Sequence, residues 1–118
     1  MLDINMRFKQ GILIVRLKGT LDKTTVPQLK KDLEVIKTNG IKYVLLNLKG
    51  LDYIDQEGLE TINNSYKEIT NNKGKLILCG INKMFGDNSI LTDNLYGVSE
   101  EVSAYEIVNI WKINVQFC

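Results

Sequence analysis

The sequence predicts an α/β fold: a single domain over residues 1–118, with a mixed, mainly parallel β-sheet and helices packed against it. Segments of strand type alternate with segments of helix type, an order that produces right-handed crossovers between parallel strands. Two of the strand segments, 43–48 and 75–79, are apolar runs too short for a typical helix and suited to interior strands. A hairpin at the start of the chain adds an antiparallel strand and makes the sheet mixed.

The hairpin is predicted from two strand-type segments, 3–8 and 12–17, separated by K-Q-G at 9–11. The second strand opens with I-L-I-V, which does not alternate between apolar and polar residues and therefore indicates cover on both faces of the sheet. Residues 19–22, G-T-L-D, are expected to form the loop that leads into the first helix.

The first helix is expected to begin near Thr24 and Thr25, either of which can cap it. Pro27 then lies in the first turn, where a missing N–H costs nothing. Asn39 and Gly40 end the helix. Its predicted buried stripe follows helical spacing and consists of Val26, Leu29, Leu33 and Ile36.

A second loop, 49–55, precedes a second amphipathic helix that ends at N-N-K-G, residues 71–74. One face of this helix carries Leu59, Ile62, Tyr66 and Ile69. The weaker pattern beyond the strand at 75–79 predicts a short helix within 84–95, a short strand at 96–102 and a terminal helix at 103–112, and it leaves 113–118 unassigned.

The composition excludes several classes of function. The chain has no histidine, which removes Ser-His and Cys-His catalysis and imidazole metal sites. Cys79 and Cys118 are the only cysteines, too few for a zinc cluster or a disulfide framework. The sequence has no apolar run of membrane-spanning length, no signal-peptide pattern and neither of the common glycine motifs that bind phosphate. We therefore expect a cytoplasmic protein that is not an enzyme, binds no cofactor or metal and does not enter a membrane.

The net charge of +1 conceals an asymmetry along the chain. Residues 1–49 carry ten basic and four acidic side chains, whereas residues 50–118 carry five basic and ten acidic ones. Such a split is compatible with a charged protein partner and equally with ordinary solvated helix faces. Because the whole chain is nearly neutral, the charge does not support a nucleic-acid partner.

Four acidic residues lie close together in the sequence at the start of the second helix: Asp52, Asp55, Glu57 and Glu60. Carboxylates are ligands for Mg²⁺ and Ca²⁺, but this spacing matches no full calcium loop. Helix starts attract acids for another reason, since Asp55 can cap the helix and Glu57 faces its positive end. Capping is the favoured interpretation, and a small metal-dependent or nucleotide-binding enzyme built on this loop is the weaker one.

Two motifs within this order of elements resemble the STAS domain of bacterial anti-sigma factor antagonists, the SpoIIAA-like proteins. Residues 15–22 are V-R-L-K-G-T-L-D, similar to the family's strand followed by G-x-L-D. Residues 46–59 are L-N-L-K-G-L-D-Y-I-D-Q-E-G-L, where the family has a strand, a short loop and then D-S-S-G-L or D-S-x-G-L at a helix start. The resemblance is strongest over residues 3–82.

The resemblance implies a STAS-type domain that binds a serine kinase acting as an anti-sigma factor. Binding frees a sigma factor, so transcription is regulated, as in bacterial sporulation or stress responses. Phosphorylation of the serine that precedes G-L breaks the complex in the family. The resemblance also implies a set of partner-binding residues, here Asp22, Asp55, Gln56, Glu57, Gly58 and Leu59. A homodimer is compatible with this interpretation.

The phospho-acceptor serine of the family is absent, because Glu57 stands in its place with Gln56 before it. A glutamate has no hydroxyl, so the usual off-switch cannot operate at this position. Glu57 either imitates the phosphorylated serine and weakens binding, or leaves the protein permanently competent. Mimicry is partial, because a carboxylate has one charge and two oxygens against about −1.5 to −2 and three oxygens for phosphate. The alternative function is a phosphorylation-independent STAS scaffold in another signalling assembly.

Overall fold

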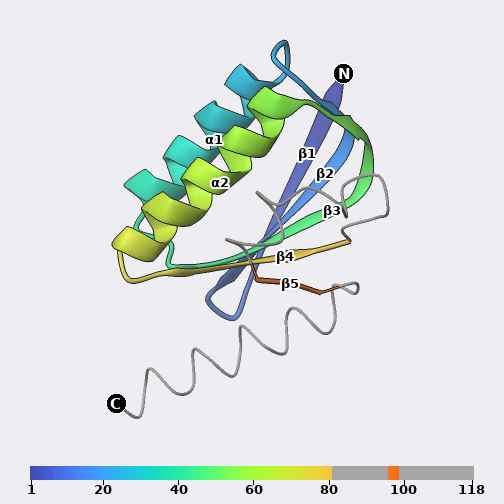
Figure 1. Cartoon of the computed structure of the whole chain (residues 1–118). Coiled ribbons are helices and arrows are strands. Elements are labelled where there is room, and N and C mark those ends of the chain that lie inside the picture. Colours follow the sequence, from blue (N-terminus) through green and yellow to red (C-terminus); the bar gives the residue numbers. More distant parts are fainter. Residues whose placement is uncertain (81–95, 99–118) are drawn as a thin grey trace.

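The computed structural model describes residues 1–80 and 96–98, which form one mixed sheet with two helices on one of its faces (Figure 1). The strand order is β1-β2-β3-β4-β5, with β1 antiparallel to β2 and every other neighbouring pair parallel. The helices are α1, Val26–Thr38, and α2, Gln56–Asn71. The strands are β1, Leu2–Lys9; β2, Ile12–Leu21; β3, Tyr43–Ile54; β4, Lys75–Cys79; and β5, Tyr96–Val98. This arrangement confirms the predicted α/β class with a mixed, mainly parallel sheet.

A tight turn of two residues joins β1 to β2. Gln10 and Gly11 both have positive φ, 52° and 83°. Positive φ at both central residues is the mark of a type I′ turn, whose twist matches that of the flanking strands. Lys9 is therefore opposite Ile12 across the hairpin, and the predicted hairpin is confirmed.

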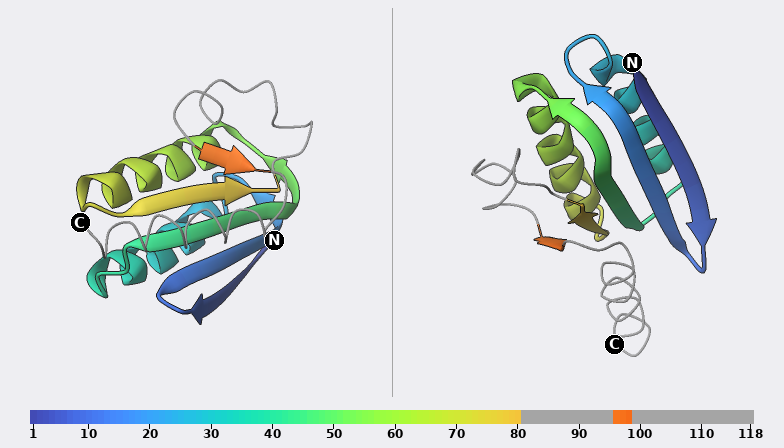
Figure 2. Two further views of the ribbon diagram at one scale, coloured as in Figure 1. Left: turned by 90° about the horizontal axis from the view of Figure 1, so that it is seen from below. Right: turned by 90° about the vertical axis from the view of Figure 1, so that its right-hand side faces the viewer.

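The main core lies between the sheet and the two helices, which run side by side on the same face (Figure 2). Ile36 of α1 and Ile62 of α2 pack there against strand residues such as Leu46. A second, smaller buried cluster lies in the same strands and consists of Ile12, Ile14, Leu45, Ile77 and Cys79. Burial on both faces explains why β2, β3 and β4 are nearly continuous apolar runs, as predicted for I-L-I-V.

Two predicted loops are largely strand in the structure, so those two predictions were wrong. β2 continues to Leu21 and β3 continues to Ile54, through most of the segments 19–22 and 49–55 that were assigned to loops. Two register shifts insert extra residues into β3 opposite β2 and break the simple period of a strand. Leu51 is buried in the main core. Its burial stabilises residues 49–54 as a strand paired with β2, in place of the predicted loop.

Several predicted elements extend past the described residues. β5 coincides with the first three residues of the strand predicted at 96–102 and pairs in parallel with β4. The remainder of that strand, the helices predicted at 84–95 and 103–112, and the unassigned tail 113–118 lie outside the described residues.

Truncation of Leu46 tests the central place of β3. Leu46 is 2% exposed in the main core, and Leu46→Ala is expected to lower the free energy of unfolding by about 2–5 kcal/mol, because it leaves a cavity. Urea titration measures this loss. Lys30→Ala, on the exposed side of α1, is the control and should change stability by less than about 0.5 kcal/mol. A loss below about 1 kcal/mol for Leu46→Ala would contradict the assignment of this position to the core.

Candidate functional site

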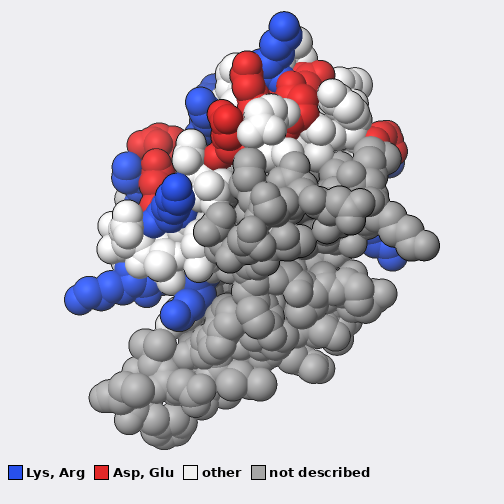
Figure 3. All heavy atoms as spheres, in the orientation of Figure 1, with Lys and Arg blue, Asp and Glu red and all other residues white. Residues whose placement is uncertain are grey.

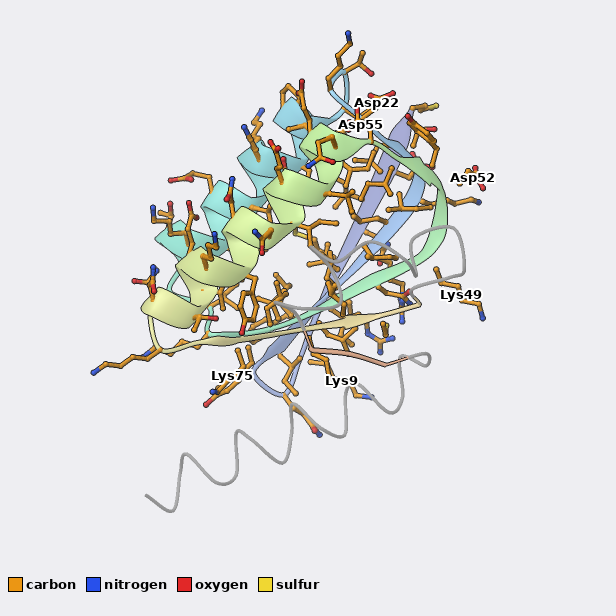
Figure 4. The ribbon with its side chains drawn as sticks, viewed as in Figure 1. Lys9, Asp22, Lys49, Asp52, Asp55 and Lys75 are labelled. Atoms are coloured by element: carbon orange, nitrogen blue, oxygen red, sulfur yellow. The ribbon has the colours of Figure 1, made fainter. Side chains whose placement is uncertain are left out.

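Two segments meet at the carboxyl ends of β2 and β3. The first is the loop 22–25 between β2 and α1, and the second is the start of α2 from Asp55 onward. They are adjacent because β2 and β3 are parallel neighbours with Leu21 opposite Ile54, and the Asp55 N–H donates to the Leu21 carbonyl over 3.1 Å. Figure 4 shows the labelled Asp22 and Asp55 side by side at this edge. We call residues 22–25 and 55–57 the candidate surface.

The Asp55 carboxylate joins the two segments. Its Oδ1 accepts a hydrogen bond from the Gly58 N–H over 2.8 Å, which caps α2 as the sequence predicts. Its Oδ2 accepts from the Lys23 N–H, 2.9 Å away and 32 residues earlier in the chain. One side chain therefore fixes both the start of the helix and the position of the neighbouring loop.

The Asp22 carboxylate organises its own loop. Its Oδ1 accepts from the Thr24 hydroxyl at 2.5 Å and from the N–H groups of Thr24 at 2.9 Å and Thr25 at 3.2 Å. The Thr24 hydroxyl first, and then the two N–H groups, hold the pKa of Asp22 below its ordinary value. The carboxylate is therefore charged at neutral pH. Because this pKa is lowered in the folded state, the stabilisation is present at neutral pH and is lost only as the pH falls into the acid range.

The hydroxyl of Thr25, one of the two residues predicted as a possible cap of α1, makes its hydrogen bonds within the loop instead. Thr25 stands at the N-cap position, but its side chain caps no helical N–H. Its hydroxyl donates to the Thr20 carbonyl and accepts from the Asp22 N–H, both at 2.9 Å. The spacing D-x-T-T is typical of such side-chain turns and could have indicated these bonds from the sequence. The chain start lies at the same edge, since the Met1 carbonyl accepts from the Thr20 N–H over 2.9 Å.

Gln56 and Glu57 present the exposed side chains of the first turn of α2. The Gln56 amide donates to Glu60 Oε1 over 3.4 Å. The Glu57 carboxylate makes no hydrogen bond or ion pair with another residue in the described part of the chain, and it stands at the positive end of the helix. Figure 3 shows acidic side chains gathered on the surface over this end of α2.

Gly58 and Leu59 are buried, whereas the STAS resemblance implies that both contact a partner. Leu59 is only 5% exposed and packs in the main core. Gly58 is buried, and a Cβ at this position would lie 2.8 Å from the Leu21 carbonyl oxygen and 2.8 Å from Ile54 Cγ1. These two residues set how closely α2 approaches the ends of β2 and β3. The exposed polar groups of the turn are the side chains of Gln56 and Glu57, which precede them.

The four acids that the sequence groups together do not converge in space. Asp52 extends from β3 away from Asp55 (Figure 4). Within residues 1–80 and 96–98, no three His, Cys, Asp or Glu side chains lie close enough together to hold a metal ion. The helices of the same residues include none that is long and apolar enough to cross a membrane.

Comparison with known proteins places this arrangement in a family. An anti-sigma F factor antagonist from Paenibacillus polymyxa is 35% identical over 82 residues, which cover 69% of this chain and 70% of that protein. An anti-sigma-B factor antagonist from Staphylococcus aureus is 29% identical over 85 residues, or 72% of this chain and 79% of that protein. The solved structure of the anti-sigma factor antagonist SpoIIAA in its unphosphorylated form has a TM-score of 0.76 at 17% identity, covering 91% of this chain and 98% of that chain. The family model of the STAS domain matches residues 3–92, and the chain belongs to the STAS domain family.

Proposed function

We propose that this chain is an anti-sigma factor antagonist that binds an anti-sigma factor of the serine-kinase type through the candidate surface and so regulates transcription. Its similarity to antagonists of anti-sigma F and anti-sigma-B factors supports this role. The surface offers the charged carboxylate of Asp22 and the exposed side chains of Gln56 and Glu57 on a backbone held by Asp55. Such a rigid, charged surface suits recognition of a basic patch on a protein partner.

Glu57 is the residue on which regulation of binding would depend. It stands where the STAS resemblance expects a serine that accepts phosphate, and its carboxylate is exposed. The carboxylate has about half the charge of a phosphate group and one oxygen fewer, so it reproduces only part of the repulsion that phosphate would exert. We propose that the protein is therefore permanently competent to bind and is not released by phosphorylation in this turn.

Neighbouring hydroxyls support the loss of the switch. Thr61 and Ser65 are buried on α2. Their hydroxyls donate to the carbonyls of Glu57 and Thr61, each over 2.8 Å. A kinase would have to unfold this part of the helix to reach either of them. Thr24 is the exposed hydroxyl within the candidate surface, but it donates to the charged Asp22 carboxylate.

A non-catalytic role agrees with how the two aspartates are used. Both oxygens of Asp55 and Oδ1 of Asp22 accept hydrogen bonds from neighbouring backbone or hydroxyl groups. Carboxylates engaged in this way position the backbone and are poorly placed to transfer protons to a substrate. The second candidate function, a scaffold in another signalling assembly, is favoured by the exposed carboxylate at position 57, because a scaffold has no need of a phosphate switch.

Glu57→Ser is expected to create a substrate for the kinase. Serine is well tolerated at a helix start, and the substitution removes a charge–dipole contact of only about 0.3–1 kcal/mol, so the fold should survive. Incubated with ATP and the anti-sigma factor kinase of its own organism, Glu57→Ser should take up phosphate at position 57 and lose binding, whereas the native protein should do neither. Mass spectrometry locates the phosphate, and calorimetry measures binding with ADP and after incubation with ATP.

Glu68→Ser is the matched control for this experiment. Glu68 is exposed on the same side of α2, eleven residues or about 16 Å further along the helix, and its replacement should alter neither phosphorylation nor binding. Before phosphorylation, Glu57→Ser should bind within a factor of about three of the native protein, under about 0.7 kcal/mol. Binding more than about tenfold tighter would establish phosphate mimicry instead. Stoichiometric phosphate on native Thr24, Thr61 or Ser65 would contradict the loss of the switch, and no binding to the kinase in any state would favour the scaffold.

Asp55→Ala tests whether the bridging carboxylate positions the surface. It removes the cap of α2 and the bond to the Lys23 N–H, and we expect a loss of about 1–2 kcal/mol in the free energy of unfolding. Because the loop 22–25 is then released, partner affinity should fall under conditions in which circular dichroism finds the variant folded. Asp52→Ala is the control, because Asp52 is exposed and directed away from the surface. Equal partner affinity for both variants would remove the bridge from the binding mechanism.

A further inference from the structure

The outer edge of β1 is unpaired within the described part of the chain, because β1 is the first strand of the sheet order (Figure 2). In a hairpin with a two-residue turn, the residues that flank the turn exchange hydrogen bonds, and alternate residues along the strand do the same. Asp3, Asn5, Arg7 and Lys9 therefore direct their backbone groups toward β2. The remaining residues direct their N–H and C=O groups outward, namely Leu2, Ile4, Met6 and Phe8.

One contact confirms this direction. The side-chain amide of Gln28 on α1 donates to the Leu2 carbonyl over 3.0 Å, at the beginning of the strand. Along the rest of the edge, the outward N–H and C=O groups of Ile4, Met6 and Phe8 pair with no other strand of the described residues. An unpaired row of this kind is a template for another strand.

Exposed apolar side chains follow the same edge. Phe8 is 60% exposed and Met6 37% exposed, and both point to the helix-bearing side, like Leu2 and Ile4, because side chains alternate along a strand. Val35 of α1, 52% exposed, lies two helical turns beyond Gln28 on the same side of the helix. Gln28 lies beside Leu2, at the beginning of β1. Two helical turns from Gln28 and three strand residues from Leu2 each span about 10 Å, so Val35 lies level with the middle of β1. These three residues are a majority of the five large apolar side chains exposed in the described part.

The sequence of β1 is complementary to itself. When two copies run antiparallel with Asn5 opposite Asn5, Asp3 of one copy lies opposite Arg7 of the other, twice over by symmetry. Ile4 then lies opposite Met6, and Leu2 opposite Phe8, on the helix-bearing side. In this register the outward backbone groups of one copy face the outward groups of the other, as an antiparallel ladder requires. Neither Asp3 nor Arg7 has an ion-pair partner within the described residues of its own chain.

We propose that β1 is a homodimer interface at which two copies of this chain join their sheets edge to edge, in antiparallel register about Asn5. The two-fold axis stands perpendicular to the sheet, so both α1 helices lie on one face and flank the joined strands. Met6, Phe8 and Val35 then lose exposure to water. This surface is separate from the candidate surface and does not depend on the proposed function.

Reversing the charges of the proposed ion pair tests the interface and its register together. Asp3→Arg places an arginine opposite Arg7, and Arg7→Asp places an aspartate opposite Asp3, so each variant alone should raise the dimer dissociation constant at least about tenfold. An equimolar mixture of the two should form heterodimers with a dissociation constant within about threefold of the native value, because both pairs then have opposite charge. Light scattering from about 1 μM to about 1 mM protein measures the assembly.

Lys30→Asp is the control, since it changes the charge as Arg7→Asp does at an exposed position of α1. Lys30 is two residues from Gln28, which contacts β1, and therefore lies on roughly the opposite side of the helix, so the dimer should be unchanged. Circular dichroism establishes that each variant is folded. A native protein that stays monomeric throughout would overturn the proposal and would leave the edge to a strand from a different protein. A native dimer that neither variant weakens, or that the mixture fails to restore, would also overturn it.

A cysteine at the symmetry axis provides an independent measurement. With Cys118 replaced by serine, Asn5→Cys places two thiols opposite each other in a pair whose Cα atoms are about 4.5 Å apart, within the range for a disulfide. Mild oxidation should convert this variant to a cross-linked dimer on a non-reducing gel. Lys9→Cys in the same background should not cross-link, because position 9 lies opposite Met1 of the second copy. Equal cross-linking of the two variants would contradict the register.

Discussion

The bridge that the Asp55 carboxylate makes between two backbone N–H groups is the interaction on which the candidate surface depends. It connects the start of α2 to a loop 32 residues earlier, and each of its oxygens accepts a bond from a different segment. Both donors are backbone groups, so the bridge places no requirement on the exposed side chains at positions 56 and 57. The chemistry of Gln56 and Glu57 can therefore change without altering the path of the chain.

The inner side of the same turn is constrained by packing. Gly58 has no room for a Cβ against the ends of β2 and β3, and Leu59 anchors the turn in the main core. The Glu57 carbonyl accepts the Thr61 hydroxyl, which adds a further restraint on the backbone at that position. A charge at position 57 thus acts on whatever approaches the surface and has little influence on the core. The same rigidity serves a reversible phosphate and a permanent carboxylate equally well.

The sequence predicts the features that depend on local chemistry and on the topology of parallel strands. The hairpin, the short apolar strands and the Asp55 cap follow from turn residues, periodicity and spacing. The resemblance placed Asp22 and Asp55 in one partner-binding set, and the structure brings them close together because β2 and β3 are parallel neighbours that end at one edge of the sheet. The full lengths of β2 and β3 could not be predicted, because bulges break the alternation that identifies a strand. Leu59 is instructive: its helical spacing placed it on the buried face, and only the resemblance suggested that it contacts a partner.

The hydrogen bond between Met1 and Thr20 has a practical consequence for anyone who handles this protein. It holds Met1 against Thr20, which lies two residues before Asp22 in the chain. Figure 1 shows the N-terminus beside the loop that precedes α1. A purification tag or fluorescent reporter joined ahead of Met1 would emerge next to the candidate surface and compete with a partner for space. Weak binding by such a fusion would then reflect steric obstruction by the added polypeptide, and the affinity of the protein itself is best measured after the tag has been cleaved.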